Sequence, residues 1–254
     1  MPSLRERVLK PIHLVDLNMI PELRYIREKD GYICIGATVT LNQIASSPII
    51  DERAHALHDA VSRIGSPQIR NQGTLTGNLC NASPAADSAP PLLVLDAEVN
   101  IESVNGVEKK PLGKLFAGPK INSLKPNELV TEIKFPVPPS NAGSAYHRIG
   151  RRKAFTISVV GAASYVEIDK GICQKARFAF GSMAETPIRA KTVEESIQGK
   201  KISTETIEKI SKTCTEHIKP IDDIRGTAEY RKDMCAVLLK RALEQSLEVA
   251  GWKK

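Results

Sequence analysis

Residues 68–96, QIRNQGTLTGNLCNASPAADSAPPLLVLD, open with a run of small and turn-forming residues, Gly73 to Asn78. Glycine has no Cβ, so the backbone at Gly73 and Gly77 can approach a ligand closely. Successive backbone N–H groups in such a turn form a concave anion site. No Lys or Arg lies between Asn71 and Asp96. Neutral donors suit the pyrophosphate of a bound cofactor better than a transferred phosphoryl group.

The loop matches neither G-x-G-x-x-G nor G-x-x-x-x-G-K-S/T, which excludes the common Rossmann and P-loop interpretations. Its second half carries a single carboxylate, Asp87, before the apolar residues 90–95. A carboxylate there can accept hydrogen bonds from sugar hydroxyls. The alternative is that Gly73–Asn78 is only a tight turn and that Asp87 caps a helix from Ser88 onward.

The order GTLTGN, ASPAAD, PPLLVLDAEV resembles the FAD-binding medium subunit of the molybdenum hydroxylase family, which includes xanthine and carbon monoxide dehydrogenases. The flavin loop of that family usually reads T-I/L-G-G-N. Here Thr76 replaces its first glycine and adds a Cβ and a hydroxyl where the backbone usually meets the pyrophosphate.

The resemblance implies a set of FAD-binding residues and no catalytic acid, base or nucleophile. It places Ile64 against the flavin, Tyr146 near the isoalloxazine, and Arg148 or His147 as a cation beside the ring. The full implied set is Gly73, Thr74, Leu75, Thr76, Gly77, Asn78, Asp87, Ile64, Val130, Tyr146 and Arg148. Ile64 could equally be a core aliphatic and Tyr146 a linker anchor, while Arg151 and Arg152 are expected at the surface or between domains.

A further flavin loop, A-G-G-T/H-D/S/E-L, precedes the matching region in the family. The resemblance aligns Met1–Arg5 with the residues just after that loop. We therefore expect an N-terminally truncated FAD-binding domain, with the loop encoded upstream, supplied by a neighbouring polypeptide, or lost.

The resemblance also implies partners. A large subunit would carry molybdopterin and a small subunit 2Fe–2S clusters, and this chain would pass electrons from the clusters to NAD or another final acceptor. A structural subunit or remnant that keeps the fold without the cofactor is the alternative. Nucleic-acid binding is a weaker one, because the net charge of +7 is dispersed and only 4% of the residues are aromatic.

Cysteine usage and hydropathy indicate a cytoplasmic, globular protein without a membrane span. The chain has 254 residues, 41% of them hydrophobic, and no long apolar run. Its cysteines are widely spaced, which predicts free thiols and no metal site in this chain. His55 and His58 have a metal-compatible spacing, but no carboxylate motif completes it.

The resemblance, together with the hydrophobic pattern, implies an α+β fold in two domains. A truncated FAD-binding domain of the vanillyl-alcohol-oxidase (PCMH) type is expected over 1–140, and a three-stranded sheet with helices, like the C-terminal domain of carbon monoxide dehydrogenase flavoproteins, over 145–254. The proline-rich segment 136–144 is the expected linker. Strands are predicted at 13–17, 32–36, 99–103, 129–135, 157–163 and 176–180, and helices at 40–45, within 51–72, at 203–217 and at 228–249.

Overall fold

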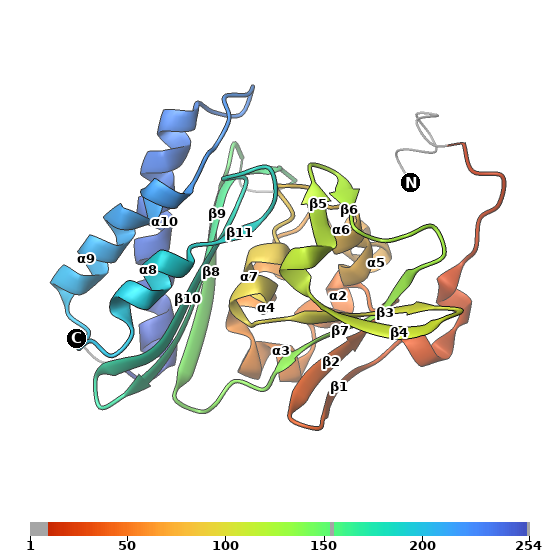
Figure 1. Cartoon of the computed structure of the whole chain (residues 1–254), viewed down its shortest axis with the longest axis horizontal. Coiled ribbons are helices and arrows are strands. Elements are labelled where there is room, and N and C mark those ends of the chain that lie inside the picture. Colours follow the sequence, from red (N-terminus) through yellow and green to blue (C-terminus); the bar gives the residue numbers. More distant parts are fainter. Residues whose placement is uncertain (1–9, 153–154, 253–254) are drawn as a thin grey trace.

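The computed structural model describes residues 10–152 and 155–252 and shows an α+β architecture built on two main antiparallel sheets (Figure 1). Met1–Arg5, to which the expectation about the first flavin loop refers, lie outside the described residues. The α+β fold class is as the resemblance and the hydrophobic pattern implied.

The first half of the chain forms a five-stranded sheet with short helices on one face. The sheet has the order β1-β2-β7-β3-β4. Its strands are β1 (Ile26–Lys29), β2 (Tyr32–Gly36), β3 (Glu98–Ser103), β4 (Gly106–Pro111) and β7 (Leu129–Pro136). The helices are η1 (Leu17–Met19), η2 (Pro21–Leu23), α2 (Leu41–Ala45), α3 (Pro48–Arg53), α4 (His55–Ser62), α5 (Pro67–Gln72), α6 (Leu75–Cys80), α7 (Ala89–Val94) and η3 (Leu112–Leu115), and β5 (Phe116–Gly118) pairs with β6 (Ile121–Asn122).

The second half forms a four-stranded sheet of order β11-β10-β9-β8. Three strands were expected and four are present in the described part of the chain, the fourth with two residues. The strands are β8 (Ala142–Gly150), β9 (Ser158–Asp169), β10 (Ile172–Gly181) and β11 (Ile188–Arg189); the helices are α8 (Lys191–Ile197), α9 (Thr204–Thr213), η4 (Cys214–His217) and α10 (Ala228–Val249). β9 and β10 match the strands predicted at 157–163 and 176–180, whereas β8, which begins inside the expected linker, had not been located. Figure 1 shows α10, with α8 and α9, on one face of this sheet and α4 and α7 on the other.

The hydrophobic core is divided between these layers. One cluster fills the space between the five-stranded sheet and its helices, and it includes Tyr146, Ala163, Tyr165 and Ala179 from the second half of the chain. The other cluster lies between the four-stranded sheet and α8–α10. The face of the second sheet that α10 leaves uncovered is therefore buried against α4 and α7 of the first half.

Two local predictions were wrong. The expected strand at 13–17 is absent from the described structure: Leu14 and Val15 are 68% and 82% exposed, and η1 begins at Leu17. The amphipathic helix predicted within 51–72 is observed as α4, whereas α3 and α5 beside it were not predicted; backbone breaks at Ala54 (φ −139°) and Gly65 (φ +56°) separate the three helices. The loop expected at 73–78 leads directly into α6, and Thr74 is its N-cap.

Candidate functional site

A cleft with a volume of about 830 Å³ lies where the two halves of the chain meet. Its walls come from the segment after α4, from the loop between α6 and α7, and from two loops of the second half. The lining residues are Ile64, Gly65, Asn78, Asn81, Ser83, Ala85, Ala86, Asp87, Lys120, Arg151, Arg152, Phe155, Thr156, Ile157, Ile224 and Arg225. Its volume is in the range of sites that hold cofactors.

The TLTGN segment is the first turn of α6. The Thr74 hydroxyl accepts the Gly77 N–H at 3.0 Å and so caps the helix. A Cβ at Gly77 would lie 3.0 Å from that hydroxyl, which explains the glycine. The Thr76 hydroxyl is buried and has no hydrogen-bond partner among the described residues. A buried polar group without a partner is costly, so this atom marks a place where a ligand can supply the missing hydrogen bond.

Asn78 connects this segment to the cleft. Its side-chain oxygen accepts a hydrogen bond from the Ser88 hydroxyl at 2.6 Å, and the residue lines the cleft. Ile64 lines the opposite part of the wall, next to the turn at Gly65. The structure thus brings three residues of the predicted set, Ile64, Asn78 and Asp87, to one cleft.

Asp87 joins the two halves of the chain. Its Oδ1 accepts hydrogen bonds from the Tyr146 hydroxyl at 2.6 Å and the Ser158 hydroxyl at 2.5 Å, and its Oδ2 pairs with Arg148 at 2.8 Å. The Asp87 side chain is 8% exposed. Most of its acceptor capacity is therefore engaged by the protein, and it does not cap α7, whose N-cap is Ser88.

Tyr146 lies behind the cleft wall rather than in it. It is 1% exposed. Burial and the adjacent Asp87 carboxylate raise the pKa of Tyr146 well above its ordinary value, so the phenol stays protonated and donates to Asp87. A Cβ at Gly161 would lie 2.3 Å from the Tyr146 hydroxyl, which shows how closely this ring is packed.

Arg148 holds three walls of the cleft together. Besides Asp87, its guanidinium donates to the carbonyl oxygens of Arg63 at 2.7 Å and Thr156 at 3.3 Å. Arg63 ends α4 just before Ile64, and Thr156 lines the cleft. The bidentate geometry of a guanidinium suits such bridging, which a lysine could not reproduce.

Four cationic side chains of the described residues border the mouth of the cleft and are called the mouth cations: Lys120, Arg151, Arg152 and Arg225. The guanidinium of Arg151 donates to the carbonyl of Ile224 at 2.9 Å, and Arg152 lies over the Phe155 ring at 5.6 Å. Arg225 is held by Asp223, which also pairs with the buried Arg231. Sequence reasoning assigned Arg151 and Arg152 to the surface or to the space between domains, and it did not single out Arg225, which lies more than 70 positions further along the chain.

The remaining predicted residues lie outside the cleft. Val130 on β7 is 1% exposed in the first core, and Leu75 on α6 is fully buried. Gly73 is the C-cap of α5. A Cβ at this position would lie 3.1 Å from the Ile69 carbonyl oxygen. These residues support the wall from behind.

Among residues 10–152 and 155–252, no group of three or more His, Cys, Asp or Glu side chains is arranged to hold a metal. No helix in the same part of the chain combines the length and apolar character needed to cross a membrane.

A small-residue turn with an unpaired buried hydroxyl lies next to Asn78, which lines a cofactor-sized cleft, and this arrangement fits a cofactor-binding protein. Family models give the particular class: "FAD binding domain in molybdopterin dehydrogenase" matches residues 1–138, and "CO dehydrogenase flavoprotein C-terminal domain" matches residues 144–246. The chain belongs to the family of FAD-binding medium subunits of molybdenum hydroxylases, which are oxidoreductases, as the resemblance implied.

Individual relatives agree. A putative xanthine dehydrogenase FAD-binding subunit of Escherichia coli is 35% identical over 243 residues, covering 95% of this chain and 83% of the relative. The carbon monoxide dehydrogenase medium chain of Hydrogenophaga pseudoflava is 31% identical over 254 residues, covering 100% of this chain and 86% of the relative.

Solved structures show the same fold. A structure of carbon monoxide dehydrogenase from Hydrogenophaga pseudoflava superposes with a TM-score of 0.93 at 31% identity, over 98% of this chain and 86% of that one. Quinoline 2-oxidoreductase from Pseudomonas putida 86 gives a TM-score of 0.91 at 26% identity, over 99% and 87%. FAD is accordingly the cofactor of this class of chain, and the unpaired Thr76 hydroxyl and the cleft fit it.

Proposed function

We propose that this chain is the electron-transfer subunit of a molybdenum hydroxylase complex. Its flavin would receive electrons from 2Fe–2S clusters on a small partner subunit, which a molybdopterin-binding large subunit reduces. NAD or another compound would take the electrons away. The observation that carries this proposal is the 830 Å³ cleft, because the TLTGN segment, Asp87 and the mouth cations all border or support it.

FAD, when bound, supplies the electron chemistry through its isoalloxazine ring. The chain's own residues would bind and orient it. The Thr76 hydroxyl and the backbone beside Gly77 would donate to the pyrophosphate, and Asn78 with Ile64 would line the path toward the ring. Asp87, Tyr146 and Arg148 would hold the walls at a fixed separation.

The cations at the mouth have a separate role in this proposal. Arg151, Arg152 and Arg225 create a positive potential beside the site. A nearby positive charge favours an anionic form of a bound group over its neutral form.

The cytoplasm is the proposed location. All the cysteines, Cys34, Cys80, Cys173, Cys214 and Cys235, are free thiols in the structure. Free, mostly buried thiols are typical of proteins that work in a reducing compartment.

Purification of the native complex tests the proposal. Molybdenum, iron and flavin would be quantified in the same fraction as this chain. The complex would then be reduced with dithionite, and reoxidation of its flavin followed after addition of NAD or a quinone. We expect all three cofactors and a flavin that is reoxidised by one acceptor. Isolation of the chain without iron- or molybdenum-containing partners contradicts the proposal, and a partnered complex without flavin supports a structural role instead.

A further inference from the structure

A second, smaller cavity of about 240 Å³ lies at the other end of the contact between the two halves of the chain. Arg53, the last residue of α3, and His55, the first residue of α4, form one side of it, and Gly143 and Ser144, near the start of β8, form the other. The large cleft instead contacts Ile64 and Gly65, beyond the end of α4. The two cavities are thus separated by the length of this helix.

The small cavity has hydrogen-bond donors that the protein does not use. Within the described residues, the side chains of Arg53, His55 and Ser140 have no hydrogen-bond or ion-pair partner. The Ser144 hydroxyl is more deeply placed, because the residue is 4% exposed. It accepts the Ala56 N–H at 3.2 Å, and its own proton has no acceptor among the described residues. An unused buried donor favours an acceptor from a ligand.

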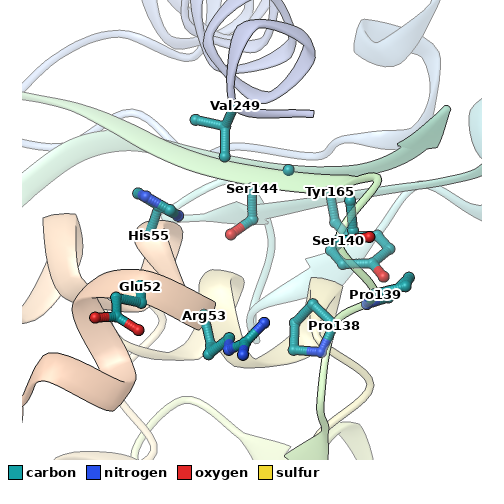
Figure 2. A pocket seen from close by; sticks show the side chains of 11 residues that line it. Glu52, Arg53, His55, Pro138, Pro139, Ser140, Ser144, Tyr165 and Val249 are labelled. Atoms are coloured by element: carbon teal, nitrogen blue, oxygen red, sulfur yellow. The ribbon is translucent and has the colours of Figure 1, made fainter. Parts of the chain in front are cut away.

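Figure 2 shows how these groups lie. The Arg53 guanidinium extends toward Pro138, and the Ser144 hydroxyl points into the space above it. Glu52 is the acidic residue of the lining, and its carboxylate points away from Ser144 and Tyr165. The groups that face the cavity centre are therefore donors and one cation, a set that matches an anion.

The rest of the lining is apolar. Pro138 and Pro139 have no N–H group, and Val249 adds an aliphatic surface at the end of α10. The Tyr165 hydroxyl is already bound to Glu167 at 2.7 Å, so its ring is what the cavity meets. A fully hydrated ion such as phosphate would leave this apolar part unused, whereas an organic acid would bury its hydrocarbon body there.

We propose that this cavity binds a small organic carboxylate. The carboxylate would accept from Arg53 and Ser144, and its apolar body would pack on Pro138, Pro139 and Val249. Residues 138–140 belong to the segment between β7 and β8, so the ligand would contact both halves and the segment that joins them. Ligand binding to the folded state then stabilises their packing.

Benzoate is a suitable probe because it combines a carboxylate with a flat ring of small volume. Calorimetric titration into the purified protein should show one saturable site. Benzamide, which has the same shape without the charge, should bind at least tenfold more weakly, and inorganic phosphate should not compete. Arg53→Gln should weaken benzoate binding about tenfold or more, since it removes a charge-assisted hydrogen bond.

Arg27→Gln is the matched control, because Arg27 is an exposed arginine on β1 that does not line the cavity and contacts the Tyr25 ring. It should leave benzoate affinity unchanged. Ser144→Ala provides a second variant that should weaken binding without removing a charge. Absence of saturable benzoate binding, equal binding of benzamide, or an unchanged affinity in Arg53→Gln would each overturn the proposal. FAD content, measured in the same samples, should not differ between Arg53→Gln and the unmodified protein, which separates this site from the flavin cleft.

Discussion

At the scale of single residues, Thr76 gives the sharpest test of the flavin site. Thr76→Val removes a buried hydroxyl that lacks a protein partner, at nearly constant side-chain volume. Without ligand, the free energy of unfolding should stay the same or rise by up to ~1 kcal/mol, because an unsatisfied group is removed. With FAD present, one hydrogen bond of ~0.5–1.5 kcal/mol is lost, so the dissociation constant should rise about 2- to 13-fold.

Denaturant unfolding and FAD titration of the same Thr76→Val sample measure both effects. Thr76→Val should leave stability unchanged or raise it while it weakens FAD binding. A variant that merely damages the fold would instead lower both stability and affinity. Lower stability of the ligand-free variant, or an unchanged FAD affinity, would contradict the assignment of this hydroxyl to the cofactor.

Asp87 is a residue whose main effect we expect on the packing of the two halves. Asp87→Asn leaves the buried Arg148 cation without its counter-charge, and breaking such a pair costs about 3–5 kcal/mol. Tyr146→Phe removes one hydrogen bond to the same carboxylate but leaves the ion pair, so it should cost about 0.5–1.5 kcal/mol. Urea unfolding of both variants tests this order; equal losses would show that the ion pair contributes little.

At the scale of elements, the contact between α10 and β8 depends on one glycine. A Cβ at Gly143 would lie 1.9 Å from the Ser246 carbonyl oxygen and 2.7 Å from the Ala250 nitrogen, both of which are backbone atoms. Gly143→Ala must therefore shift the helix, at a cost of at least about 1–3 kcal/mol. Gly113→Ala is the control, since its Cβ would be 3.6 Å from the Leu93 side chain, an ordinary contact. Thermal unfolding should show a large loss for the first variant and a small change for the second.

The loop that brings Ile224 and Arg225 to the cleft is held by Asp223. Partial burial alone would raise the pKa of Asp223, but hydrogen bonds from Arg225 and the charges of Arg231 and Arg225 lower it to about 2. Because its pKa is lower in the folded state, Asp223 stabilises the fold at pH values above its unfolded pKa, which is near 3.8. This contribution to stability is lost as the pH falls toward 2. Asp223→Asn should flatten the acid side of the stability profile between these values, as measured by unfolding at a series of pH values. A stability profile identical to that of the unmodified protein would show that protonation of Asp223 is not coupled to unfolding.

Elements with strong periodicity were predictable and their mutual placement was not. The stripe of α10, the alternation in β10 and the capping Thr40–Gln43 pair of α2 are local signals, and the structure confirms each. The segment at 13–17 is short and apolar, which predicted a strand. A strand needs a neighbouring strand to accept its hydrogen bonds, however, and none is present here among the described residues.

The same limit applies to the site. The TLTGN segment and Asp87 were recognised from the sequence, whereas the partners of Asp87 follow it by 59 to 71 positions. Those contacts depend on the register of β8 and β9 against the first half of the chain, and a sequence pattern carries no information about such a register. Lys120 and Arg225 were missed for this reason as well, since they come from segments far from each other and from Arg151 and Arg152 in the sequence.

At the scale of the whole molecule, the two halves are covalently joined by a short exposed segment and are also packed together extensively. Arg177 on β10 donates to the carbonyl of Val94 at 3.0 Å, and Asp96 pairs with both Arg177 and Arg189. α7 packs on β9 and β10, and α4 packs on β8. The proposed boundary at 136–144 does not divide the hydrophobic core, because Tyr146 and Tyr165 belong to the first hydrophobic cluster.

Limited proteolysis should therefore have two separable outcomes. The first cut should fall between Pro136 and Ser144, where Pro139 and Ser140 are exposed, whereas Leu92–Leu95 is buried in α7 and the residue after it. The two fragments should then co-elute on size-exclusion chromatography, because cutting one connection leaves the Asp87–Arg148 pair and the packing of α7 in place. Asp87→Asn should make the nicked protein separate at a lower urea concentration than the nicked unmodified protein. A first cut within Leu92–Val99 would contradict the proposed boundary, and fragments that separate without denaturant would show that the linker, rather than this packing, keeps the cleft walls together.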